Sequence, residues 1–164
     1  MTEKSLGGIF PKGSKQLEDI IKEVTSGSNH SKSGAIFTFT GYVRESSLFN
    51  SAKVKEIEIE AWDEKVFETM NAICQELITK FELTDARIWH GTGRFFIGEP
   101  LVYIVISSAH RGEGLKAMEE AIHLYKTRAP IWKKEIYENG QEEWISGKEK
   151  GSSKGESYNN NSKI

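Results

Sequence analysis

The chain has 164 residues, 37% of them hydrophobic and 28% charged, and a formal net charge of -2. This predicts one soluble globular domain with its own core, and the nearly balanced charge argues against a nucleic-acid-binding domain, which is typically basic. The longest apolar run, at residues 101–106, is too short to cross a bilayer, and the sequence starts without a cationic and then apolar leader, so we expect a cytoplasmic protein. The single cysteine, Cys74, excludes an intrachain disulfide and should fill core space.

The first part of the chain predicts one helix and one strand. A short apolar stretch, GGIF, spans residues 7–10. Apolar residues at helical spacing then predict a helix within residues 14–24, with Ser14 as its N-cap. After a polar loop, residues 34–43 (GAIFTFTGYV) are rich in aromatic and β-branched side chains, and they predict a strand.

Residues 52–62 alternate between apolar and acidic side chains, which is typical of a half-exposed strand. The expected inward set is Ile57, Ile59 and Ala61, and the expected outward set is Glu56, Glu58 and Glu60. A helix should follow from Asp63, its expected N-cap, to about Phe81. Its expected buried positions are Val66, Met70, Ile73, Leu77 and Ile78.

The middle of the chain predicts two further strands and a second long helix. Residues 85–93 predict a strand that closes on glycines, and residues 94–100 predict a turn. The nearly continuous apolar run at residues 101–110 predicts a central strand. The helix should extend from about residue 113 to 126, because Pro130 disfavours helical geometry at the residue before it. Its expected apolar stripe is Leu115, Met118, Ile122 and Tyr125.

The last part predicts a hairpin and a tail. Asn139-Gly140 is the strongest hairpin-turn signal in the chain, and it predicts a β-hairpin over residues 131–145. Residues 146–164 contain almost no apolar side chain, so we expect a disordered polar tail. Together these elements predict one α+β domain over residues 1–145, with a mostly antiparallel sheet and two long packed helices.

Three common kinds of site are disfavoured. The four histidines lie on separate predicted elements without ligand spacing, so we expect no metal centre. The glycine pattern does not match a phosphate-binding loop, and we expect no cofactor. Ser108 and His110 should lie ~6.6 Å apart along a strand with parallel side chains, which disfavours a serine nucleophile with its base.

Positive charge gathers instead at the ends of predicted elements. The stretch YKTRAPIWKKE, at residues 125–135, contains Lys126, Arg128, Lys133 and Lys134. Each cation alone could simply complement a helix dipole or protect a strand edge. However, successive strand residues face opposite ways, so one of Lys133 and Lys134 should face a cleft, where a cation needs a reason. We therefore expect this corner of the molecule to receive an anion.

Further cations lie elsewhere in the chain. Arg44 follows the first predicted strand. His110 and Arg111 precede the second long helix, where free backbone amides also favour an anion. This helix separates His110 and Arg111 from Lys126 by about 20 Å. One small-molecule pocket in one chain can hardly contain both ends. Either they serve different purposes, or a two-fold dimer brings them together, and we favour the dimer.

The strings GAIFTFTGYVR, SSAHR and LYKTRAPIWKKE, in this order and spacing, resemble the large catalytic subunit of molybdopterin synthase over residues 34–145. The resemblance implies an α/β-hammerhead fold and a sulfur transferase of molybdenum-cofactor biosynthesis that converts cyclic pyranopterin monophosphate to molybdopterin. It also implies a homodimer at the centre of a heterotetramer. A small ubiquitin-like subunit at each end would supply sulfur from its C-terminal Gly-Gly thiocarboxylate.

The resemblance also implies site residues, with Lys126 and Lys133 as the catalytic candidates. If Lys133 and Arg128 lower its pKa, Lys126 acts as nucleophile or proton shuttle, and if it stays protonated it stabilises an oxyanion. Arg44, His110 and Arg111 are suited to gripping the cyclic phosphate. The full expected substrate-binding set is Phe39, Tyr42, Val43, Arg44, His110, Arg111, Lys126, Lys133, Lys134 and Glu135.

Two other functions stay open from the sequence. One is a scaffold that docks the small subunit without chemistry, although four cations aimed at a cleft argue against it. The other is a single-stranded nucleic-acid-binding module that uses the basic and aromatic stretch around Trp132, although a pI near 6.1 disfavours it. The segment ESSLFNSAK, at residues 45–53, departs from the loop that is usual in the family, and so do Arg94, Ile122 and His123.

Overall fold

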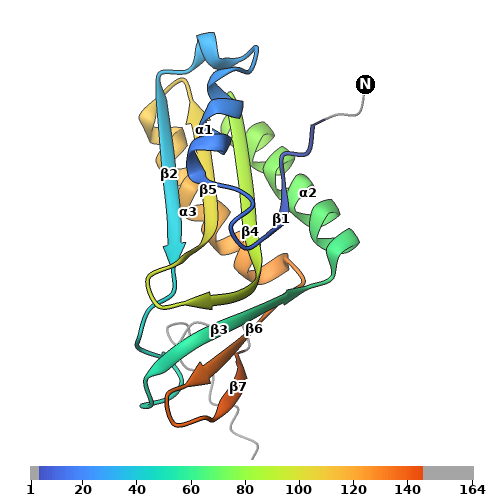
Figure 1. The fold of residues 1–164 in the computed structure, drawn as a ribbon. Coiled ribbons are helices and arrows are strands. Elements are labelled where there is room, and N and C mark those ends of the chain that lie inside the picture. Colours follow the sequence, from blue (N-terminus) through green and yellow to red (C-terminus); the bar gives the residue numbers. More distant parts are fainter. Residues whose placement is uncertain (1–3, 146–164) are drawn as a thin grey trace, which may run out of the picture.

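The computed structural model describes residues 4–145, so the predicted tail at 146–164 lies outside the described part. Within residues 4–145 the chain forms three α-helices and a seven-stranded sheet (Figure 1). None of these helices is long and apolar enough to span a membrane. The elements are β1 (Gly7–Pro11), α1 (Leu17–Thr25), the 3-10 turn η1 (His30–Lys32), β2 (Ala35–Tyr42), β3 (Val54–Ala61), α2 (Asp63–Phe81), β4 (Asp85–Phe96), β5 (Pro100–Ser108), α3 (Arg111–Arg128), β6 (Ile131–Tyr137) and β7 (Glu142–Ile145).

The sheet has two halves that are joined by the long strand β4. The strand order is β2-β5-β4-β3-β6-β7, and β1 pairs with β4 in the parallel sense, whereas the other described pairs are antiparallel. Residues 85–90 of β4 pair with β5, and residues 93–96 pair with β3. Gly93 lies at the junction with φ +107°, a conformation that glycine adopts readily. The mostly antiparallel α+β fold predicted from the sequence is confirmed.

The turn predicted at residues 94–100 is wrong in extent, because β4 continues through the glycines to Phe96. Phe95 explains the continuation: its side chain is 1% exposed and packs in the core beneath β3. Burial of that ring favours a strand over an exposed turn. The remaining turn centres on Gly98, whose φ is +83°.

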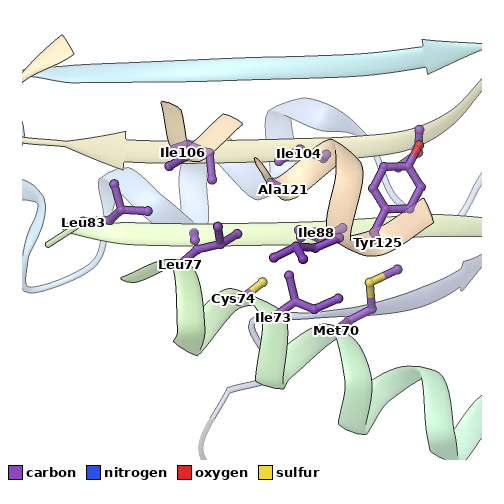
Figure 2. Close-up of a cluster of buried hydrophobic side chains, with 14 of the residues drawn as sticks. Met70, Ile73, Cys74, Leu77, Leu83, Ile88, Ile104, Ile106, Ala121 and Tyr125 are labelled. Atoms are coloured by element: carbon purple, nitrogen blue, oxygen red, sulfur yellow. The ribbon is translucent and has the colours of Figure 1, made fainter. Parts of the chain in front are cut away.

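We call β1, β2, β5 and residues 85–90 of β4 the upper half of the sheet. The main core lies between this half and the two long helices, α2 and α3 (Figure 2). Met70, Ile73 and Leu77 of α2 pack against isoleucines of β4 and β5, as the helical spacing predicts, whereas Ile78 is partly buried at the edge of this core. Cys74 is fully buried, and burial raises the pKa of its thiol to about 12. It fills core space, as expected.

The expected apolar stripe of α3 is wrong at Leu115, whereas Tyr125 is buried as predicted and Met118 and Ile122 are partly buried against the main core. Leu115 is 56% exposed, and small residues, Gly114, Ala117 and Ala121, face the sheet instead, with Leu124 and Tyr125 below them. A Cβ at Gly114 would contact the Phe37 ring and lie 2.6 Å from the Ser108 hydroxyl. The helix therefore lies too close to β2 and β5 for large side chains on its inner face.

Both predicted N-caps are also wrong. Helix α1 begins after Gln16, whose backbone N–H donates to the Asp19 carboxylate at 2.9 Å, while the Ser14 hydroxyl donates to the Pro11 carbonyl. Asp63 is the first residue inside α2, and Trp62 occupies the cap position. An acidic side chain in the first helical turn still complements the helix dipole.

Helix α1 covers the opposite face of the upper sheet (Figure 1), where its Ile20 and Val24 pack with Phe10, Trp89 and Tyr103. The lower half of the sheet consists of β3, β6, β7 and the end of β4. The predicted hairpin of β6 and β7 is confirmed, with Gly140 in its turn at φ +83°.

Two of the three glutamates of β3 are less exposed than the alternating pattern predicts, whereas Glu60 is exposed as expected. Ile57 and Ile59 are buried as expected, but Glu56 is only 9% exposed and lies 3.3 Å from Arg94, and Glu58 lies 2.9 Å from the Lys134 ammonium. Strand β3 lies between β4 and β6, and the cations of these neighbours cover its acidic face. Cross-strand charge pairing explains why the strand tolerates these acidic side chains.

Candidate functional site

A cavity of about 470 Å³ lies where the two halves of the sheet meet. Its walls come from the end of β2, from β3, β4 and β5, from the last turns of α3 and from β6, and the segment after β2 closes one side. Of the predicted substrate-binding residues, the cavity is lined by Phe39, Tyr42, Val43, Arg44, Lys126, Lys133 and Glu135. The structure thus brings residues 39–44 together with residues 126–135, which lie far away in the sequence.

The backbone around Arg44 is held by the turn between β4 and β5. The pairing of β2 with β5 shifts register between Gly41 and Tyr42, where the strand ends. Val43 is buried and donates its N–H to the Glu99 carbonyl at 3.0 Å, while its carbonyl accepts from Gly98 at 2.8 Å. The Arg44 side chain therefore extends from a firmly held stretch of backbone at the edge of the cavity.

Lys126 and Lys133 reach the same cavity because α3 ends abruptly. Lys126 lies in the last turn of α3, and Ala129 already has extended geometry with ψ 130°. Pro130 imposes this geometry on the residue before it, so the chain leaves the helix and enters β6 within a few residues. The predicted helix end is confirmed.

Lys133 and Lys134 face opposite sides of β6, as strand alternation predicts. Lys133 lines the cavity, whereas Lys134 lies outside it, 2.9 Å from Glu58 and 3.4 Å from Glu142. Its ammonium also lies 5.3 Å from the centre of the Trp144 ring. In this structure Lys134 therefore pairs with carboxylates of the lower half of the sheet, while Lys133 contributes its positive charge to the cavity.

The cavity carries an excess of positive charge. Among its described lining residues, the cations Arg44, Lys126 and Lys133 outnumber the carboxylate of Glu135. Burial lowers the pKa of Lys133, and the Glu135 carboxylate opposes this lowering, while Arg44 and Lys126 add to it. The Lys133 side chain keeps 41% of its surface accessible. Such a site attracts an anionic ligand and contains a lysine that loses its proton more easily than usual.

Glu135 is 5% exposed, and its two carboxylate oxygens have different partners. Oε2 accepts hydrogen bonds from the Ser47 hydroxyl and from the Tyr137 hydroxyl, the latter at 2.9 Å. Oε1 lies 3.8 Å from the Lys133 ammonium. The carboxylate is therefore fixed in one orientation at the wall of the cavity. No signal in the sequence points to Ser47, because it lies 88 residues from Glu135.

His90 also lines the cavity, although no sequence motif predicted it there. It is 5% exposed on β4, and its ring centre lies 6.0 Å from that of Tyr125. Nδ1 is 2.8 Å from the Gly91 carbonyl, which can only accept, so Nδ1 carries the proton. Burial lowers the pKa of His90 to about 4, and nearby Lys133 adds to the lowering. Strand alternation could have predicted this burial, because His90 lies two residues after the apolar Ile88 and so shares its face of β4.

His110 and Arg111 lie apart from this cavity in the single chain. His110 is the N-cap residue of α3 and Arg111 its first residue, so the length of the helix separates them from Lys126. Arg128 does not crowd Lys126 as expected, because its guanidinium is 2.6 Å from Glu76 of α2. That ion pair joins α3 to α2 and directs the arginine away.

The fold and the cavity define a class: α+β proteins with a basic cavity between the end of a long helix and two sheet halves. Residues 14–128 match the family described as MoaE protein. A molybdopterin synthase catalytic subunit from Pyrococcus abyssi is 36% identical over 134 residues, which cover 81% of this chain and 88% of the relative. The chain therefore belongs to the MoaE family, and the resemblance noted in the sequence is confirmed.

Two solved structures share the fold. Molybdopterin synthase from Staphylococcus aureus aligns with a TM-score of 0.75 and 32% identity, covering 87% of this chain and 97% of the other. A chain in the complex of subunits 1 and 2 of molybdopterin-converting factor from Helicobacter pylori aligns with a TM-score of 0.66 and 19% identity, covering 88% and 92%. The predicted fold class is confirmed by these structures.

Proposed function

We propose that this chain catalyses sulfur transfer to cyclic pyranopterin monophosphate, with the chemistry in the cavity of Lys126 and Lys133. The observation that carries the proposal is the convergence of Arg44, Lys126 and Lys133 on one cavity, from the segment after β2, from α3 and from β6. Membership of a family whose curated relatives are molybdopterin synthase catalytic subunits supports the same reaction.

The cavity suits an anionic, ring-shaped substrate. Its volume of about 470 Å³ lies within the usual range for small-molecule sites. Phe39, Tyr42 and Phe49 supply aromatic surface for a pterin ring, and Arg44 offers a planar guanidinium that matches a phosphate.

We propose that a second copy of the chain completes the site with His110 and Arg111. Both lie at the N-terminus of α3, where backbone amides and the helix dipole favour an anion. The length of α3 keeps them out of their own cavity, so they can reach a bound phosphate only from a neighbouring chain. A homodimer with two composite cavities is the simplest arrangement that adds His110 and Arg111 to the cations already at the cavity.

The proposed sulfur donor is a small ubiquitin-like subunit with a C-terminal thiocarboxylate. The related Helicobacter pylori chain comes from a complex of two different subunits, which supports a small partner here. The thiocarboxylate sulfur would bond to a side-chain carbon of the precursor while a carbon–oxygen bond at that carbon breaks and its oxygen leaves as water or with the phosphate. Water would then cleave the acyl–sulfur bond. The sulfur stays on the pterin, the small subunit leaves with a carboxylate, and a second transfer completes the dithiolene.

The lowered pKa of Lys133 suggests how the two lysines divide the work. Lys133 would give up and recover a proton as bonds to sulfur form and break. Lys126 would stabilise the negative charge that develops on the carbonyl oxygen of the acyl group. The neutral His90 beside them adds no positive charge that would compete for the anion.

Replacing Lys126 with alanine tests the proposal. The purified chain, a thiocarboxylated small subunit and cyclic pyranopterin monophosphate should yield molybdopterin, measured as its oxidised fluorescent product. Lys126→Ala should lower the rate by about 100-fold or more, because a charge aimed at the developing oxyanion is lost. Lys116→Ala, an exposed change on the same helix, should leave the rate unchanged.

Size-exclusion chromatography with the small subunit distinguishes catalysis from docking. Lys126→Ala should still form the complex, since the lysine acts on the transferred group. A wild-type chain that binds the small subunit but yields no product would instead show the scaffold function. A Lys126→Ala variant with the wild-type rate would contradict the catalytic role of the lysine.

A further inference from the structure

The segment between β2 and β3 departs from the family pattern, and it forms one wall of the cavity. Ser46, Leu48 and Phe49 of this segment line the cavity, while Ser47, between them, points to Glu135 instead. The segment is closed by pairing of Ser46 with Lys53 and by a hydrogen bond of 2.8 Å from the Val54 N–H to the Glu45 carbonyl. These contacts fix Ser47 next to Glu135 at the wall of the cavity.

The hydrogen bonds of the Ser47 hydroxyl determine where its proton goes. Its oxygen accepts the backbone N–H groups of Phe49 at 3.1 Å and Asn50 at 3.3 Å. A hydroxyl has two acceptor positions and one donor, so both acceptor positions are occupied and the proton remains for Glu135. The fold of the segment thus makes Ser47 a dedicated donor to Glu135 Oε2.

A second donor, the Tyr137 hydroxyl, lies 2.9 Å from the same oxygen, and Glu143 Oε2 of β7 is its more distant acceptor at 3.2 Å. With Oε2 held from two sides, Oε1 stays 3.8 Å from the Lys133 ammonium, beyond the range of a hydrogen bond. The ion pair of Glu135 and Lys133 is therefore held open. A carboxylate free to rotate would close this pair, because a direct charged hydrogen bond is stronger than a separated one.

We propose that Ser47 is a positioning residue: its hydroxyl holds Glu135 away from direct contact with Lys133 and so keeps the Lys133 proton available for transfer. The role of that proton rests on the proposed function, whereas the effect on Lys133 does not. Other charged groups that act on Lys133 are Arg44 after β2 and Lys126 of α3, and Lys133 itself acts on His90 of β4. Tyr42 and Tyr125 line the same cavity, and Glu143 of β7 lies 3.2 Å from the Tyr137 hydroxyl.

Competitive acetylation of the protein alone tests the positioning role, with Lys133 labelling measured by mass spectrometry across a pH series. Ser47→Ala should raise the apparent pKa of Lys133, because a closer carboxylate favours the charged ammonium. At one pH below the midpoint, Lys133 labelling should slow by roughly three- to tenfold. Ser47→Thr keeps the hydroxyl and should restore the wild-type profile. Ser51→Ala, an exposed change in the same segment, should have no effect.

Tyr137→Phe provides a second variant that keeps the buried ring and removes the other donor to Oε2. It should shift Lys133 labelling in the same direction as Ser47→Ala. If both variants fold and label Lys133 like the wild type, the positioning role is wrong, even if synthesis of molybdopterin changes.

The synthesis assay supplies an independent readout. In Ser47→Ala the acidic limb of the pH–rate profile should move to higher pH, and kcat should fall by roughly three- to tenfold with little change in KM. A change in KM alone would mean that Ser47 only shapes the cavity wall, and it would overturn the proposal. If the wild type yields no product, the proposed function fails, while the acetylation series still decides the role of Ser47.

Discussion

Burial fixes the charge of single residues at the cavity wall. His90 is buried on β4 and donates through Nδ1 to the Gly91 carbonyl, so it stays neutral until the pH falls to about 4. Lys133, by contrast, is destabilised as a cation by burial and by two neighbouring cations, while the Glu135 carboxylate opposes this. The site therefore combines a neutral imidazole with a lysine that releases its proton easily.

The buried histidine should make stability depend on pH. The pKa of His90 is about 4 in the folded chain and near 6.5 when it is exposed, so the unfolded state binds the proton first as the pH falls. Stability is therefore lost between these two values, by on the order of 2–3 kcal/mol near the lower end of this range. Urea unfolding of the wild type and His90→Gln, compared at neutral and acidic pH, measures this loss.

His90→Gln should show a smaller fall in the free energy of unfolding between the two pH values. The exposed His123 provides a control, because His123→Gln should keep the wild-type pH dependence. An equal fall in His90→Gln and the wild type would show that His90 takes up no proton on unfolding in this range.

Among the elements, α3 connects the core to the site. Its first residues lie at one end of the upper sheet, small side chains let its middle approach β2 and β5, and its last turn presents Lys126 to the cavity. Close packing of the middle thus sets where Lys126 lies. A helix displaced by a larger side chain would move the lysine as well.

Two glycines at the start of α3 form a matched test of this packing. Gly114→Ala should lower the free energy of unfolding by about 1–3 kcal/mol, because the added methyl group clashes with Phe37 and Ser108. Gly112→Ala meets no atom within 4 Å and should be neutral or stabilising by up to about 0.5 kcal/mol. Thermal or urea unfolding measures both. Equal stability of the two variants would contradict the close approach of α3.

Helix α3 also shows the limits of periodicity. In α2, large apolar residues recur at helical spacing and do face the core, so its buried face was predictable. In α3 the distance to the sheet selects Gly114 and Ala117 for the inner face, and Leu115 is left outside. Amphipathic spacing reports side-chain size and polarity, and it carries no information on how closely a neighbouring element approaches.

At the scale of the whole molecule, the fold creates the site by joining distant segments. The sequence motifs pointed to Arg44, Lys126 and Lys133, and the structure places all three at one cavity. The motifs gave no sign of Ser47 or His90, whose roles depend on contacts with residues far along the chain. Such contacts arise from sheet topology, because β4 joins the two halves and β6 returns beside β3.

We propose that His110 and Arg111 of a second chain complete the basic cavity. Subunit mixing distinguishes this shared site from a single-chain site, with Lys126→Ala and Arg111→Ala chains that are each inactive alone. If the site is shared, a mixed dimer has one cavity with both changes and one with neither. Statistical exchange should then restore about a quarter of the wild-type rate, because half of the dimers are mixed and each has one intact site. A mixture that exchanges subunits and stays inactive would show that each chain uses its own arginine, and would contradict the shared site.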